Sequence, residues 1–166
     1  AYNEEKTIAK VIGEVLKTQV SGVQKEIIVV NDGSKDNTKN ILDKYKKMKG
    51  LKIVHHAINK GKGAAIKTGI ARSSGSIIII QDADLEYNPK EYSKILPPLL
   101  KKETKVVYGS RIDAIKKNLD KMYLTHYFGN RALSLATSIL YGQWISDMET
   151  GYKAFRREVI AGMPLN

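Results

Sequence analysis

The feature that most constrains the fold is a run of four isoleucines, Ile77 to Ile80, which leads directly into the stretch Gln-Asp-Ala-Asp at 81–84. A short β-branched run without alternation is typical of a strand that is apolar on both faces, in the interior of a mostly parallel sheet. Ligands of open α/β sheets bind beyond the carboxyl ends of the strands. The pattern therefore predicts that Asp82 and Asp84 lie at a ligand-binding edge.

Strands and helices alternate along the rest of the chain, which is the pattern of an α/β fold. Apolar residues at helical spacing predict helices, and short β-branched runs predict strands. We expect helices over 5–20, 37–48, 61–74, 89–102 and 129–142, and strands over 26–32, 51–56, 76–84 and 105–111.

The chain has 166 residues, of which 42% are hydrophobic, and this is enough for one buried core. The first residues, Ala-Tyr-Asn-Glu-Glu, have the composition of a loop that follows a strand. We therefore expect a single domain over 1–166 that is a fragment of a longer protein, lacking its first strand and any C-terminal extension.

The chain contains no cysteine and carries a formal net charge of +11. Disulfides, thiolate metal sites and thiol nucleophiles are thereby excluded, and we expect a cytoplasmic location. No apolar run approaches the roughly 20 residues that span a bilayer. The positive charge predicts attraction to an anionic partner, which is nucleic acid, a phospholipid surface or a phosphorylated substrate.

Asp82 and Asp84 are two residues apart, so in an extended segment their side chains point the same way and can face one cation or diphosphate. Ligands that offer only oxygen favour Mg²⁺ or Mn²⁺ over zinc, with substrate phosphates and water completing the coordination. The alternative is a solvated turn after a buried strand, because clustered carboxylates mark functional sites only statistically.

A second buried strand also ends in an acid, Asp32, which is followed by Gly33 and Ser34. Turn chemistry is one explanation, with Asp36 or Asn37 capping the next helix. The other is that Asp32, Asp82 and the loop at 1–5 collect at one edge of the sheet. An acid at that edge can accept hydrogen bonds from a ribose or a base.

The stretch at 59–69 imitates the phosphate loop of nucleotide triphosphatases, but Ile66 stands where that loop requires glycine before its lysine. We expect instead that the glycines let a basic turn approach a ligand phosphate at a helix N-terminus. The alternative is a glycine-rich helix start without a ligand. The residues of this turn are Lys60, Gly61, Lys62 and Gly63.

Six stretches follow one another along the chain: AYNEE at 1–5, VVNDGSKDNT at 29–38, NKGKGAAIKTGI at 59–70, QDADLEYNP at 81–89, VVYGSR at 106–111 and DMETGYKAFRREV at 147–159. In this order they resemble the nucleotide-sugar glycosyltransferases of GT-A fold. The likeness is strongest to dolichyl-phosphate mannose synthases and bacterial polyprenyl-phosphate glycosyltransferases. It covers nearly the whole chain.

The resemblance implies a Rossmann-like, three-layer α/β/α sandwich with a mostly parallel central sheet. It implies an inverting enzyme that moves a hexose from GDP-mannose or UDP-glucose to a dolichyl or undecaprenyl phosphate. Such an enzyme works at the cytosolic face of a membrane, which it contacts peripherally.

The resemblance also assigns roles to residues. Asp82 and Asp84, with Glu86, would hold Mg²⁺ or Mn²⁺ and the diphosphate, and Arg111 would face the acceptor phosphate. The segment from Asp147 to Lys153 would border the donor sugar and the acceptor, through Glu149, Thr150 and Lys153. Tyr2, Glu4 and Asp32 would hold the nucleoside, and Lys60, Gly61 and Gly63 complete the donor site.

The nature of the acceptor and the presence of catalysis stay open at this stage. A phosphate acceptor is already ionised and needs an arginine to position it, which suits Arg111, whereas a sugar hydroxyl would need a base such as Asp147 or Glu149. A basic module that binds nucleic acid or membrane without catalysis is a further alternative, although no nucleic-acid-binding motif is present. We expect no role for His55 and His56.

Overall fold

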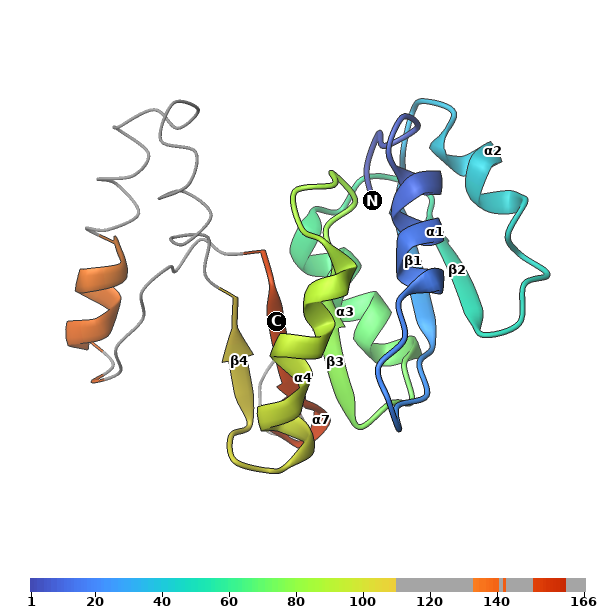
Figure 1. Ribbon diagram of the computed structural model, residues 1–166. Coiled ribbons are helices and arrows are strands. Elements are labelled where there is room, and N and C mark those ends of the chain that lie inside the picture. The colour runs from blue at the N-terminus through green and yellow to red at the C-terminus, as the bar shows by residue number, and fades with distance from the viewer. Residues whose placement is uncertain (110–132, 141, 143–150, 161–166) are drawn as a thin grey trace, which may run out of the picture.

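The computed structural model of the chain describes residues 1–109, 133–140, 142 and 151–160. Helices and strands alternate through the first hundred residues, as the hydrophobic pattern predicts (Figure 1). A further helix covers 133–140. In chain order the remaining elements are α1 (Ile8–Lys17), β1 (Ile27–Asp32), α2 (Thr38–Asp43), β2 (Leu51–His56), α3 (Lys62–Arg72), β3 (Ile77–Ile80), η1 (Pro89–Glu91), α4 (Tyr92–Leu100), β4 (Val106–Tyr108), β5 (Lys153–Arg156) and α7 (Arg157–Ile160).

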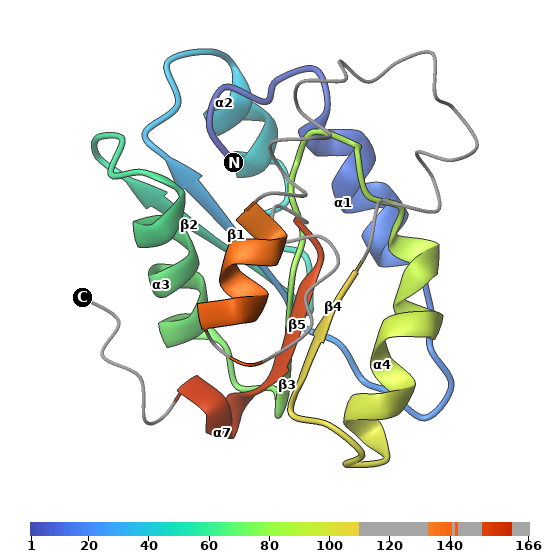
Figure 2. The ribbon, with the colours of Figure 1, turned by 90° about the vertical axis from the view of Figure 1, so that its left-hand side faces the viewer.

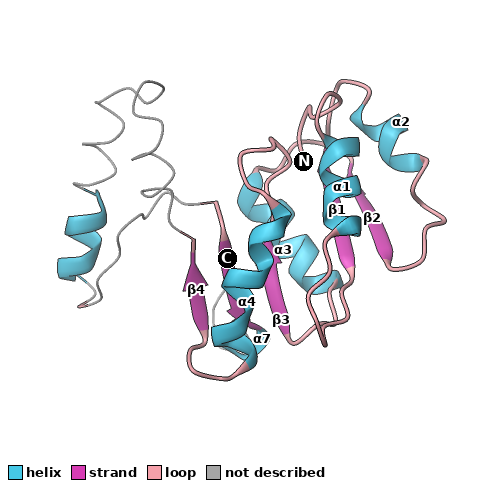
Figure 3. Cartoon of the chain, in the orientation of Figure 1, coloured by secondary structure: helices cyan, strands magenta, loops and turns pink. Residues whose placement is uncertain are grey.

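The strands form two hydrogen-bonded groups in a single layer. β1 and β2 are parallel, with Ile27 opposite Leu51 and Asp32 opposite His56. The second group has the order β3-β5-β4. Helices cover both faces of this layer, with α3 on one face and α1 and α4 on the other (Figures 2 and 3). The predicted α/β class and three-layer arrangement are therefore confirmed.

β5 is a strand that the hydrophobic pattern did not predict, and it lies antiparallel to both of its neighbours, β3 and β4. The expected parallel pairing therefore holds for β1 and β2, while β5 makes the other group of the described strands antiparallel. Ala154, in the middle of β5, is fully buried between these neighbours. β5 thus joins the central layer although it comes late in the chain.

The buried core lies on the α1 and α4 face of the strand layer. One cluster joins Val11 and Val15 of α1 to Leu96 and Leu99 of α4 and to Tyr152 before β5. A second cluster packs the other side of α1 against α2 and β2. The apolar stripe of α1, which repeats every three or four residues, therefore contacts two parts of the fold at once.

β3 is less buried than its sequence predicts. All four isoleucines, Ile77 to Ile80, are only half-buried, and α3 on the neighbouring face has no fully buried residue. The reason is that one edge of β3 faces a cavity, because among the described strands β3 pairs only with β5. None of the helices that the structure describes is long and apolar enough to cross a bilayer.

Candidate active site

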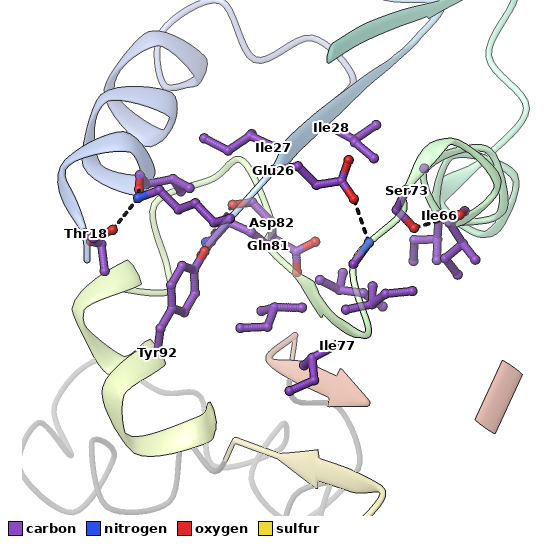
Figure 4. Close-up of a pocket in the computed structure, with 18 of the residues that line it drawn as sticks. Thr18, Glu26, Ile27, Ile28, Ile66, Ser73, Ile77, Gln81, Asp82 and Tyr92 are labelled. Carbon is purple, nitrogen blue, oxygen red and sulfur yellow. Dashed lines mark hydrogen bonds between the residues drawn. The ribbon is translucent and has the colours of Figure 1, made fainter. Parts of the chain in front are cut away.

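A cavity of about 1310 Å³ lies between β1 and β3 and reaches the carboxyl ends of both strands. At that end it is lined by Tyr2, Glu4, Asp32, Asn59, Lys62, Asp82 and Asp84. The prediction that Asp32, the two aspartates after β3 and the N-terminal loop gather at one edge of the sheet is therefore confirmed. Toward the other end the lining becomes apolar, with isoleucines from β1, β3 and α3 (Figure 4).

Asp32 is almost fully buried at the end of β1, and both of its carboxylate oxygens already have partners. Oδ1 accepts from Nδ1 of His56 at 2.6 Å and from the backbone N–H of Lys60 at 3.0 Å, and Oδ2 accepts from the N–H of Gly61 at 2.8 Å. Burial alone would raise the pKa of Asp32, but these hydrogen bonds outweigh it and hold the pKa below its ordinary value. Asp32 therefore anchors the basic turn at 60–61 as an ionised carboxylate.

His56 is a contributor to the site that sequence analysis missed. It lies opposite Asp32 in the register of β1 and β2, and its Nε2 is 2.9 Å from the Thr68 hydroxyl on α3. The side chain is 8% exposed. It thus connects the site aspartate to the helix that covers the sheet. A histidine at the end of a strand was the available signal, but its partner depended on a register that the sequence does not display.

The N-terminal loop is tied to the loop after β1 by reciprocal hydrogen bonds. The N–H of Asn3 donates to Ser34 Oγ at 3.0 Å, and Asn3 Oδ1 accepts from the N–H of Lys35 at 2.8 Å. The N–H of Glu4 donates to Thr38 Oγ1 at 2.8 Å, whereas the Glu4 carboxylate accepts from the Thr7 hydroxyl. Tyr2 is 41% exposed beside the cavity. Of the two predicted nucleoside contacts in this loop, both of which line the cavity, Tyr2 is therefore the more exposed.

The two glycines of the turn before α3 differ in what the structure requires of them. Gly61 has a φ of 88°, which a side chain rarely tolerates. At Gly63, by contrast, an added Cβ would meet no atom of the protein within 4 Å. Packing of the described residues therefore gives no steric reason for glycine at 63, and a ligand contact at this turn stays a prediction.

The carboxylates after β3 differ in their surroundings. Asp82 binds the Lys62 ammonium, with Nζ 2.7 Å from Oδ1 and 2.9 Å from Oδ2. Asp84 is exposed, and its Oδ1 accepts from the N–H of Glu86 at 3.0 Å. The Glu86 side chain is exposed and does not line the cavity.

These carboxylates fit part of a divalent-cation site. In the described ranges no three His, Cys, Asp or Glu side chains gather closely enough to hold a metal ion. Asp82 and Asp84 can supply two carboxylate ligands, of the oxygen type that Mg²⁺ and Mn²⁺ accept. Substrate phosphates and water would have to provide the rest, and Lys62 would have to release Asp82.

A buried tyrosine cluster supports the segment that carries these aspartates, and sequence analysis missed it as well. Gln81 Oε1 accepts from the hydroxyls of Tyr92 and Tyr152, at 2.9 and 3.0 Å, and burial raises the pKa of both phenols above their ordinary range. Gln81 Nε2 in turn donates to the carbonyl oxygens of Asp82 and Tyr87. These hydrogen bonds therefore fix the turn after β3, and Figure 4 shows Gln81 and Tyr92 beside the cavity.

The segment before β5 passes close to Asp82. The N–H of Gly151 donates to the Tyr87 hydroxyl at 2.6 Å, and a Cβ added at Gly151 would lie 2.5 Å from Asp82 Oδ2. Lys153 is half-buried on β5, with its ammonium 6.0 Å from the centre of the Tyr108 ring. The other predicted acceptor-side residues, Arg111, Asp147, Glu149 and Thr150, lie outside the described residues.

The family model for glycosyl transferase family 2 matches residues 1–162. The chain is 32% identical over 182 residues to the UDP-N-acetylglucosamine--dolichyl-phosphate N-acetylglucosaminyltransferase of Methanococcus voltae, with 96% of this chain and 68% of that protein covered. It is 31% identical over 169 residues to the dolichyl-phosphate beta-glucosyltransferase ALG5A of Trichomonas vaginalis, with 95% and 51% covered.

A solved structure matches the fold. The crystal structure of glucosyl-3-phosphoglycerate synthase from Mycobacterium tuberculosis, in complex with Mn²⁺ and UDP-glucose, aligns with a TM-score of 0.71 at 26% identity. The alignment covers 99% of this chain and 56% of that one. This chain thus spans between about half and two thirds of the length of the proteins described here.

Proposed function

The chain belongs to glycosyl transferase family 2 and has the GT-A fold, and on that premise we propose that it is the catalytic domain of an inverting hexosyltransferase. Its donor is a nucleotide-diphosphate sugar, GDP-mannose or UDP-glucose, and its acceptor is a polyprenyl phosphate. The observation that carries the proposal is the shared cavity end where Asp32, Asp82, Asp84 and the loop at 1–4 meet.

The groups at that end of the cavity have distinct roles in such a transfer. The acceptor oxygen forms a bond to the anomeric carbon while the bond from that carbon to the diphosphate oxygen breaks, so the leaving diphosphate gains negative charge. Asp82 and Asp84 would hold Mg²⁺ or Mn²⁺, which neutralises this charge when bound. The Lys62 side chain is 63% exposed and can turn from Asp82 toward the diphosphate, and Tyr2 is accessible to the nucleoside.

Rigidity of the aspartates matters as much as their charge. The hydrogen bonds of Gln81 and the contact with Gly151 fix the turn after β3, and Asp32 fixes the turn at 60–61. Charges that are held in place before the reaction stabilise a transition state without the cost of rearrangement. The apolar strand β3 thus serves as a scaffold for the carboxylates at its end.

The acceptor suggests peripheral contact with the cytosolic face of a membrane. Two relatives are named for dolichyl phosphate, which is a lipid. The helix over 133–140 exposes Leu133, Leu135, Ile139 and Leu140, whose side chains suit an apolar surface. Together with the net charge of +11, these residues favour attraction to anionic lipid.

Binding of the donor tests the proposal against a purely charge-driven binder. We expect UDP-glucose or GDP-mannose to bind with Mn²⁺ and to lose at least about 10-fold in affinity when the metal is chelated. Calorimetry at about 0.05 M and about 0.5 M salt provides the comparison. A protein that binds by charge alone would ignore the metal and weaken steeply with salt, and that result would contradict the proposal.

Arg111 is proposed to serve the acceptor phosphate and not the donor. In the enzyme, Arg111→Lys is expected to lower transfer to polyprenyl phosphate by about 100-fold with little change in donor affinity, because lysine lacks the two-pronged guanidinium. Kinetics with both substrates varied measure this. Arg72→Lys, at the exposed end of α3, is the matched control. Loss of donor affinity with unchanged dependence of the rate on acceptor concentration would show that Arg111 serves the donor and not the acceptor.

A further inference from the structure

His56 ties the end of β2 both to the end of β1 and to α3. Its Nδ1 lies 2.6 Å from Asp32 Oδ1, and its Nε2 lies 2.9 Å from the Thr68 hydroxyl. An ionised carboxylate only accepts hydrogen bonds, so Nδ1 carries a proton, and in the neutral ring Nε2 accepts from Thr68. One imidazole ring therefore uses both of its nitrogens to join the strand layer to the helix that covers it.

Asp32 depends on this hydrogen bond because its carboxylate is buried. The side chains of Asp32 and His56 are 4% and 8% exposed. Burial raises the pKa of Asp32, and the bond from His56 contributes most among the hydrogen bonds that lower it. A buried charge that loses a partner is costly, so without the bond from His56 the carboxylate would turn toward water.

The orientation of this carboxylate in turn fixes the backbone at 60–61. Oδ1 of Asp32 accepts from the N–H of Lys60, and Oδ2 accepts from the N–H of Gly61, so two successive amides bind one carboxylate. Oδ1 is also the atom that His56 binds. Rotation of the carboxylate would therefore break the bonds to the turn together with the bond to the histidine.

The turn carries two side chains that line the cavity, Asn59 and Lys62. The Lys62 ammonium lies 2.7 Å from Asp82 Oδ1, at the end of the cavity where the donor site is proposed. His56 itself does not line the cavity. Its influence on a ligand there must therefore pass through Asp32 and the turn.

We propose that His56 is a positioning residue of the donor site, which holds the Asp32 carboxylate and thereby keeps the turn at 59–61 and Lys62 in place for the nucleotide diphosphate. The identity of the ligand rests on the proposed function, whereas the order of the turn does not. The bond from Nδ1 to Asp32 carries this role, and the bond of Nε2 to Thr68 orients the ring.

Two substitutions of His56 separate its two hydrogen bonds. His56→Asn places an amide nitrogen near the position of Nδ1, so it keeps the bond to Asp32 and loses the one to Thr68. His56→Gln places its amide near the position of Nε2, so it keeps the bond to Thr68 and loses the one to Asp32. Thr68→Val is the matched control, because it leaves His56 bound to Asp32. Each variant loses one buried hydrogen bond, so the Tm should fall by similar amounts in all three.

Nucleotide affinity should distinguish these variants although their stabilities are similar. In calorimetry with UDP and with GDP, each with Mn²⁺, we expect His56→Gln to bind about 10-fold more weakly than the unaltered protein. His56→Asn and Thr68→Val should stay within about 3-fold of it. Hydrogen exchange without nucleotide should be about 10-fold faster at the amides of Lys60 and Gly61 in His56→Gln alone.

Equal loss of affinity in His56→Asn and His56→Gln would overturn the proposal, because a role in packing alone does not distinguish the two bonds. Unchanged exchange at Lys60 and Gly61 in His56→Gln would overturn it as well, whichever nucleotide the protein binds. Binding of neither UDP nor GDP by the unaltered protein would overturn the proposed function and the donor role of His56 with it. The exchange measurement would then still show whether His56 holds the turn.

Discussion

Replacing Asp84 with asparagine is expected to weaken Mn²⁺-dependent binding of the nucleotide donor by about 100-fold. The substitution removes one negative charge from the carboxylates that would hold the cation. Asparagine keeps a side-chain oxygen, so the hydrogen bond from the Glu86 N–H is retained. Because the side chain is exposed, the Tm should change by no more than about 2 °C.

Asp43→Asn is the matched control for this experiment. It removes the same charge from a carboxylate on α2 that pairs with Lys39 and Lys46 and does not line the cavity. Titration of nucleotide in the presence and absence of Mn²⁺ should therefore separate the two variants. Equal metal-dependent binding by the Asp84 variant and the unaltered protein would remove Asp84 from the proposed site.

Gly33→Ala is expected to cost about 3 kcal/mol or more of the free energy of unfolding. Gly33 has a φ of 69°, where a side chain is strained by about 1 kcal/mol. An added Cβ would also lie 2.5 Å from the backbone nitrogen of Asn59 and closer still to the carbonyl carbon of Ile58. The backbone at Gly33 and the backbone at 58–59 would have to move apart, and this movement would carry the turn at 59–61 away from Asp32.

Gly50→Ala provides a close control because Gly50 has a φ of 82° but no atom within 4 Å of an added Cβ. It should show the backbone strain alone, about 1 kcal/mol, in urea unfolding. The difference in the free energy of unfolding between the two variants then gives the cost of the clash between the added Cβ at 33 and the backbone at 58–59. Equal destabilisation of both variants would mean that these loops do not pack as described.

Local sequence patterns were sufficient to predict most elements up to β4 and the edge where the site lies. The apolar spacing in α1 and the β-branched runs of β1 and β3 identify their own secondary structure, because one face of each must be buried. The acids Asp32 and Asp82 could be assigned to the same edge because parallel strands that alternate with helices all end there.

Pairing partners and register were decided only by the tertiary structure. β5 is four residues long, and its antiparallel place between β3 and β4 depends on strands that come nearly fifty residues or more earlier in the chain. The contact of His56 with Asp32 depends on the register of β1 and β2, and the bonds of Gln81 to Tyr92 and Tyr152 on the packing of α4 against β5. A local pattern states which face of an element is apolar, whereas its neighbour is chosen by long-range packing across the whole layer.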